Sequence, residues 1–87
     1  MPNTQKILTK RVQTANNWVN LAELFGITLV DDKLYSIQIV GSAKISYNTD
    51  PTEGYFTRND PKPFTYECKT GDSLFINTND ALVTIAE

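Results

Sequence analysis

Apolar and polar residues alternate along much of the chain, in short runs separated by turn-forming residues. The clearest run spans residues 33–40. Within it Tyr35, Ile37 and Ile39 fall on one face of an extended strand. The alternation returns in residues 43–47, and β-branched and aromatic residues, which favour strands, are frequent in both runs. The pattern therefore predicts a chain built mainly of short β-strands.

Turn-forming residues mark the boundaries of these runs. Gly41-Ser42 and Asn79-Asp80 each separate two strand-like runs by two residues, which is the spacing of a β-hairpin. Asp31-Asp32 and residues 70–72 indicate further turns. The predicted strands cover residues 6–14, 18–21, 27–30, 33–40, 43–47, 64–68, 73–78 and 81–86. About seven or eight short strands of this kind are typical of a small antiparallel β-sandwich or barrel, jelly-roll or immunoglobulin-like, formed here by residues 1–87 as one domain.

Residues 18–26 fit two local structures. Several apolar residues there fall at helical spacing, an asparagine precedes them as a cap, and Gly26 follows them as a terminator. Two strand fragments around a turn fit almost as well. We favour a short strand at residues 18–21 followed by a single helical turn near residues 21–26.

Residues 48–63 show no regular period and hold three of the four prolines. A loop of this length is uncommon in a compact domain and often functional. Tyr55, Phe56 and Arg58 give it the composition of an interface anchor. Alternatively the loop folds back so that one ring caps the sheet, and both arrangements can hold at once; stacking on carbohydrate would use the same residue types. The other aromatic residues are expected to fill the core: Trp18, Tyr35, Phe64, Tyr66 and Phe75.

Composition excludes several kinds of chemistry. The 87 residues include no histidine and a single cysteine, Cys68. Ser-His-Asp and Cys-His nucleophile systems, histidine-based metal sites and four-cysteine zinc sites are therefore excluded, as is an intramolecular disulfide. Cys68 lies in an alternating strand and is expected to face the core. We do not expect an enzyme.

Carboxylates are the remaining candidates for chemistry. Asp31-Asp32 is expected to serve turn geometry. Asn48, Asp50 and Glu53 offer oxygen ligands at short spacing that could hold calcium, but the spacing is not that of an EF-hand and a polar loop explains it more simply. The glycines form no phosphate-binding motif. We expect no metal and no cofactor.

Charge is unevenly distributed. Lys6, Lys10 and Arg11 precede the first acidic residue, Glu23, although the formal net charge is −2. These basic residues fit a solvated strand edge protected against aggregation, or an arm that docks on an acidic neighbour. They are too few for a nucleic-acid footprint. No apolar run approaches the roughly 18 residues of a membrane span and no secretory signal is visible, so folding in a reducing cytosol is expected.

Three segments carry a resemblance to a known class of protein. They are YSIQIVG at residues 35–41, GDSLFI at residues 71–76 and ALVTIAE at residues 81–87, with Trp18 ahead of them. This order resembles the small all-β virion proteins of tailed bacteriophages, some of which read Y-x-I-Q-N-x-G in mid-chain. Ile39 stands here where that pattern has asparagine.

The resemblance implies a non-enzymatic structural protein of the virion, synthesised in the host cytoplasm. Its expected role is decoration of the outer capsid surface, with the major capsid protein or another virion protein as partner and a homo-oligomer, such as a trimer, as the assembled form. Alternatives are a head-fibre or tail-associated virion protein and a small carbohydrate-binding β module. The residues from which we expect partner contacts are Lys6, Lys10, Arg11, Tyr55, Phe56 and Arg58.

Overall fold

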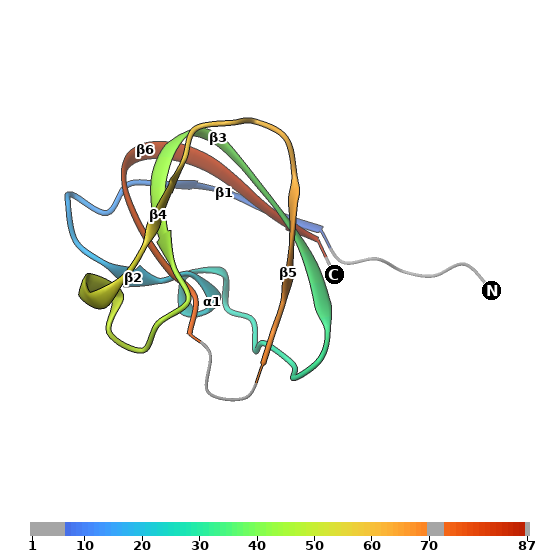
Figure 1. Ribbon diagram of the computed structural model, residues 1–87. Helices are drawn as coiled ribbons and strands as arrows, with labels where there is room; N and C mark the ends of the chain where they lie inside the picture. Colours follow the sequence, from blue (N-terminus) through green and yellow to red (C-terminus); the bar gives the residue numbers. More distant parts are fainter. Residues whose placement is uncertain (1–6, 70–72, 87) are drawn as a thin grey trace.

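The part of the chain that the structure describes folds into a single antiparallel sheet of six strands with one short helix (Figure 1). This computed structural model describes residues 7–69 and 73–86. Its elements, in chain order, are β1 (Ile7–Val12), β2 (Val19–Asn20), α1 (Leu21–Phe25), β3 (Leu34–Ser46), the 3-10 turn η1 (Pro51–Glu53), β4 (Phe56–Arg58), β5 (Phe64–Glu67) and β6 (Phe75–Ala86). The prediction of a small all-β domain is confirmed.

Two long strands at the centre organise the sheet. β3 has 13 residues and β6 has 12, and they pair antiparallel over most of their length. β1 and β2 pair with the other edge of β6, whereas β4 and β5 pair with the other edge of β3. In Figure 1 the sheet is strongly curled, with β4 and β5 in front of β1, β3 and β6.

The core lies inside this curl. Tyr35, Ile37 and Ile39, predicted to share one face of a strand, are all buried. Ile37 lies opposite Ile85 of β6, so the two side chains point to the same face. Burial of one such aliphatic side chain contributes about 1.5–3 kcal/mol. The other buried members of the core are Val12, Leu21, Ala43, Ile45, Tyr66, Cys68, Leu74, Ile76, Ala81, Val83 and Ile85.

The favoured prediction for residues 18–26 is confirmed, because the short strand β2 leads directly into one helical turn. Asn20 caps α1 by accepting a hydrogen bond from the backbone N–H of Glu23 at 3.0 Å. Gly26 ends the helix in the left-handed conformation, with φ of 68°. The helix buries Leu21 and Ala22 against the sheet.

Both predicted two-residue hairpins are wrong. β3 runs without interruption through Gly41-Ser42, and β6 runs through Asn79-Asp80. The two pairs lie next to each other in the ladder, since Ser42 faces Asp80 and Gly41 faces Ala81. The residues predicted to reverse the chain therefore form an irregular stretch of two paired strands. Among the described residues the sheet has six strands, rather than the seven or eight expected.

The irregularity is a β-bulge. The register passes from Ser42 opposite Asp80 to Lys44 opposite Asn77. Two residues of β6, Thr78 and Asn79, therefore face the single residue Ala43 of β3. Such a bulge increases the local bend and twist of a sheet.

Two threonines form hydrogen bonds with backbone groups at the bulge. The Thr78 hydroxyl donates to the carbonyl of Ser42 at 2.7 Å and accepts from the N–H of Asp80 at 3.2 Å. Thr14, in the connection between β1 and β2, accepts from the N–H of Thr78 through its hydroxyl at 3.0 Å, and its own N–H donates to the carbonyl of Thr78 at 2.9 Å. The backbone N–H and carbonyl of Thr78, the buried residue of the bulge, are thereby both paired.

Two further expectations need correction. Residues 27–30 form no strand; in this connection between α1 and β3 the N–H of Val30 donates to the hydroxyl of Tyr35 at 2.8 Å. Residues 48–63 are not one irregular loop, because they contain η1 and β4. The turn expected at residues 70–72 lies outside the described residues.

Candidate functional site

The basic residues near the N-terminus do not form one patch. Lys10 and Arg11 are neighbours in β1 and point to opposite faces. Lys10 lies opposite the buried Val83, on the core-facing side of the strand, yet it is exposed. A charge placed there opposes pairing of the strand with another sheet. Lys6 lies outside the described residues.

Arg11 is engaged by a carboxylate. Its Nε and Nη2 atoms donate to the two carboxylate oxygens of Asp80, each at 2.8 Å. These hydrogen bonds lower the pKa of Asp80 and raise the pKa of Arg11. Both side chains are largely exposed, so the pair contributes little to stability and mainly fixes the position of the guanidinium.

Tyr55 and Phe56 also point to opposite faces. Phe56 lies opposite the buried Ile45 and packs edge-on against Tyr47, with ring centroids 5.6 Å apart. Phe56 also contacts Phe64 and remains 39% exposed. The Phe56 ring therefore folds back onto the core side of the sheet, which is the arrangement in which one ring of the loop caps the sheet.

Tyr55 does not fold back onto the core and is 52% exposed. Its ring contacts Trp18, with centroids 5.5 Å apart, and the Lys44 ammonium lies 5.4 Å from its centroid. Trp18 is half-buried and stands outside the core that it was expected to fill. Because Trp18 precedes β2 and Tyr55 precedes β4, their contact joins segments that flank opposite edges of the central strand pair.

Arg58 is held within its own connection. Its Nη2 atom donates to the carbonyl of Lys62 at 2.8 Å, and its guanidinium lies 4.8 Å from the centroid of the Phe64 ring. These contacts stabilise the connection between β4 and β5. Its buried Nε has no hydrogen-bond partner within the described part of the chain.

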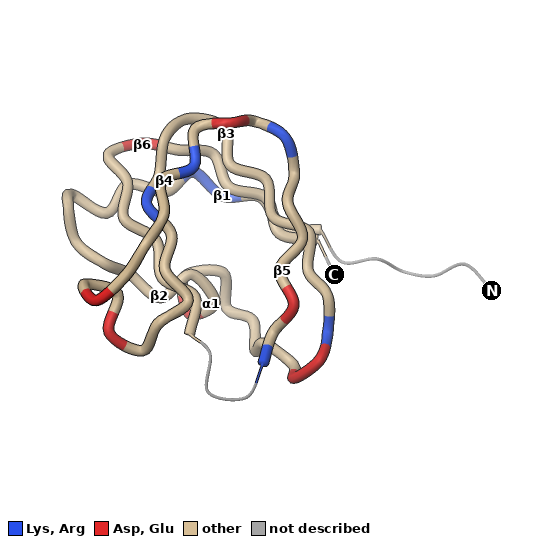
Figure 2. Tube along the Cα trace, viewed as in Figure 1, with Lys and Arg blue, Asp and Glu red and all other residues tan. Residues whose placement is uncertain are grey.

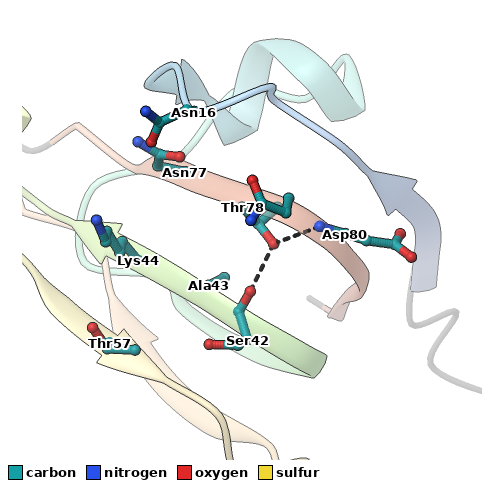
Figure 3. Close-up of a pocket in the computed structure, with 9 residues that line it drawn as sticks. Asn16, Ser42, Ala43, Lys44, Thr57, Asn77, Thr78 and Asp80 are labelled. Atoms are coloured by element: carbon teal, nitrogen blue, oxygen red, sulfur yellow. Dashed lines mark hydrogen bonds between the residues drawn. The ribbon is translucent and has the colours of Figure 1, made fainter.

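A polar hollow of about 290 Å³ lies beside the bulge (Figure 3). Lys44 faces Thr57 of β4 on one side and Asn77 of β6 on the other, so these three side chains share a face of the sheet. In Figure 3 Asn16 lies near Asn77, across the hollow from Thr57. The lining residues are Asn16, Ser42, Ala43, Lys44, Thr57, Asn77, Thr78, Asn79 and Asp80. None of them was predicted as a site residue, because only the strand register brings them together.

Next to the hollow, the same face of β1, β6 and the first half of β3 forms an almost uncharged surface. Val40 lies directly opposite Leu82, which in turn lies opposite Arg11. The adjoining rows carry threonine, serine, alanine and glutamine, and the paired Arg11 and Asp80 are the charges on this face. We call it the sheet face, made of Ile7, Thr9, Arg11, Ser36, Gln38, Val40, Asp80, Leu82, Thr84 and Ala86. Figure 2 shows long uncharged stretches along these strands.

The acidic residues of the loops serve local geometry. Asp50 caps η1, accepting hydrogen bonds from the hydroxyl of Thr52 at 2.6 Å and from its N–H at 3.0 Å, and these bonds lower the pKa of Asp50. Asp32, with φ of 63°, closes a turn and accepts from the Lys69 ammonium at 3.2 Å. Within residues 7–69 and 73–86, no three histidine, cysteine, aspartate or glutamate side chains are placed to hold a metal ion.

Cys68 is buried in the core cluster, as predicted. Across the described chain, no helix is long and apolar enough to cross a membrane. The sequence matches no protein-family model, and neither curated proteins nor solved structures give a match.

Proposed function

We propose that this protein is a non-enzymatic structural component of a bacteriophage virion, which decorates the outer surface of the capsid by docking through the sheet face. The resemblance of three segments to small all-β virion proteins supports the class. The absence of histidine and the burial of Cys68 fit a protein that acts through surface contact.

The character of the sheet face is the observation that carries the docking proposal. Val40 and Leu82 lie side by side on it and are 47% and 45% exposed. Ile7 is exposed on the same face. Protein interfaces are depleted of charge at their centre and use aliphatic contact framed by polar groups. The guanidinium of Arg11, positioned by Asp80, supplies such a group at the rim.

Co-sedimentation tests the proposal. Shells assembled from the major capsid protein of the same genome are mixed with the purified chain and pelleted. We expect wild type to pellet with the shells and Val40→Lys to stay in solution, because a buried ammonium without a partner opposes docking. Val30→Lys is the matched control, since Val30 is also exposed but lies in the connection before β3. Wild type that fails to pellet at micromolar concentration, or a Val40→Lys variant that pellets equally well, contradicts the proposal.

Labelling of whole virions separates the capsid from other locations. Gold-conjugated antibody should mark the head surface uniformly. Label confined to a fibre or the tail would contradict capsid decoration and would indicate that the sheet face docks on that structure instead. Sedimentation velocity of the free chain measures the proposed homo-oligomer, for which we expect a trimer.

A further inference from the structure

The hollow beside the bulge holds polar groups with unused hydrogen-bonding capacity. The side-chain amides of Asn16 and Asn79 and the hydroxyls of Ser42 and Thr57 make no hydrogen bond to another described residue. Lys44 has no carboxylate partner among the described residues; its ammonium lies over the Tyr55 ring. Hydrogen-bond donors and acceptors therefore line the same hollow.

Other lining groups are already engaged and give the hollow a fixed frame. The Thr14 hydroxyl shares its one proton between the Thr78 carbonyl at 3.2 Å and the Oδ1 atom of Asn77 at 3.4 Å, which leaves the Asn77 NH2 group as a donor. Thr78 is bound to the bulge backbone (Figure 3). Asp80 is bound to Arg11. The free groups of Ser42, Lys44, Thr57 and Asn79 thus stand on paired strands, and Asn16 lies in the turn between β1 and β2.

We propose that this hollow binds one pyranose unit of a glycan. Its volume of about 290 Å³ is close to the lower limit of ligand pockets, about 300 Å³, which suits a single sugar ring. Amides and hydroxyls match the mixed donor and acceptor character of sugar hydroxyls. Tyr55 and Trp18, joined to the hollow through Lys44, offer aromatic surface to the C–H face of a neighbouring ring.

The lining argues against other ligand classes. A phosphate or polyanion is normally held by several cations or by a cradle of backbone N–H groups, whereas Lys44 is the single cation that lines the hollow in the described chain. A divalent cation needs several oxygen ligands including carboxylates, and the one carboxylate among the described lining residues belongs to Asp80, whose two oxygens accept from Arg11.

The test is a titration of the 15N-labelled chain with glucose, galactose, mannose, N-acetylglucosamine and N-acetylneuraminic acid, followed through the side-chain amide signals of asparagine and the indole signal of Trp18. We expect at least one neutral sugar to shift these signals saturably with a Kd in the millimolar range. Asn16→Gly removes an amide without strain, because Asn16 has φ of 64°. We expect this variant and Thr57→Val each to raise the Kd about five-fold, as for one lost hydrogen bond.

Thr65→Val is the matched control, because Thr65 is exposed on the short strand β5 and does not line the hollow; it should bind like wild type. The proposal is overturned if none of the sugars shifts the signals, or if Asn16→Gly and Thr57→Val bind unchanged. Binding of the acidic sugar alone, abolished by Lys44→Met and by salt, would identify an anion site and also overturn it. The titration uses the free chain without capsid shells, so sugar binding and capsid docking can each fail independently of the other.

Discussion

Replacement of Gly41 by alanine should be the most damaging glycine substitution in the described chain. Gly41 lies in β3 beside the bulge with φ of 121°, a conformation that residues with a Cβ rarely adopt. A Cβ built there would lie 3.0 Å from the carbonyl oxygen of Asp80 and 3.3 Å from the Cα of Ala81. Both atoms are backbone of the paired strand β6, so they cannot move aside as a side chain could.

The cost has two parts. Holding a non-glycine residue in a sparsely populated backbone region costs about 1–3 kcal/mol, and forcing an extra methyl group into a packed site adds about 1–3 kcal/mol. The loss of unfolded-state entropy on replacing glycine offsets about 0.4–1 kcal/mol. The three ranges add to a net destabilisation of about 1–6 kcal/mol. The middle of this range, about 3 kcal/mol, lowers the Tm of a domain of this size by roughly 12–24 °C.

Two other glycines separate the strain from the contact. Gly26 has φ of 68°, but a Cβ added to it would meet nothing within 4 Å, so Gly26→Ala carries conformational strain alone, about 1–2 kcal/mol. Gly54 has an extended backbone with φ of −179°, and its Cβ would meet only the terminal amide of the exposed Asn48 at 3.0 Å. Gly54→Ala should therefore be close to neutral.

Thermal unfolding followed by circular dichroism, together with urea unfolding at 25 °C, measures the three variants. The expected order of destabilisation is Gly41, then Gly26, then Gly54. If Gly41→Ala melts together with Gly26→Ala, the close backbone contact with β6 is absent. If Gly41→Ala melts together with wild type, the bulge geometry itself is refuted.

Substitutions at three further positions test the polar and edge contacts. Thr14→Val leaves the buried N–H of Thr78 without its acceptor and should cost about 1–3 kcal/mol in urea unfolding, whereas Thr14→Ser should retain most of the stability. The pKa of Asp80 is lowered in the folded state, so the stabilisation from the Asp80 carboxylate is present above the unfolded pKa and is lost as the pH falls through the folded pKa. The Tm of Asp80→Asn should therefore fall less than the Tm of wild type on acidification below about pH 4. An Asp80→Asn variant with the full acid sensitivity of wild type would exclude the Arg11 contact as a contributor. Lys10→Val removes the charge from the core-facing side of β1 and should increase self-association in size-exclusion chromatography; a monodisperse profile identical to wild type would contradict its role in edge protection.

The sequence was sufficient to predict the β class and the inward face of β3. The alternation of Tyr35, Ile37 and Ile39 has a period of two, and only an extended strand places all three in one core. The helical turn was predictable for a different reason, since Asn20 and Gly26 supply local caps at both ends. Both features depend on short-range chemistry that a linear sequence displays.

The candidate site was predicted less completely, because it depends on pairing between distant segments. Tyr55 and Phe56 formed one aromatic pair in the sequence, yet strand alternation sends Phe56 to the core side and Tyr55 to the opposite face. Lys44 and Asn77 become neighbours only through the β3–β6 register. No local signal connects these two residues.

The two wrong hairpins differ in how well the sequence could have excluded them. In β3 the inward residues Ile39 and Ala43 are four apart, which keeps a single alternation across Gly41-Ser42. A two-residue hairpin pairs the residues that flank it, so Ile39 and Ala43 would then point to opposite faces. The buried pattern of β3 is therefore incompatible with a hairpin and requires one continuous strand.

In β6 the pattern changes phase, because Ile76 and Ala81 both face the core although they are five residues apart. A two-residue hairpin at Asn79-Asp80 and a one-residue bulge both shift the alternation by one, so the sequence of β6 alone cannot distinguish them. Pairing with β3 distinguishes the bulge from the hairpin. Because β3 keeps a single alternation along its length, the one-residue shift must occur within β6 while β6 stays paired with β3. The bulge does so, and it thereby keeps Ile76 in the core while turning Asn77 out beside Lys44. The same extra residue that completes the core thus places a polar side chain in the hollow.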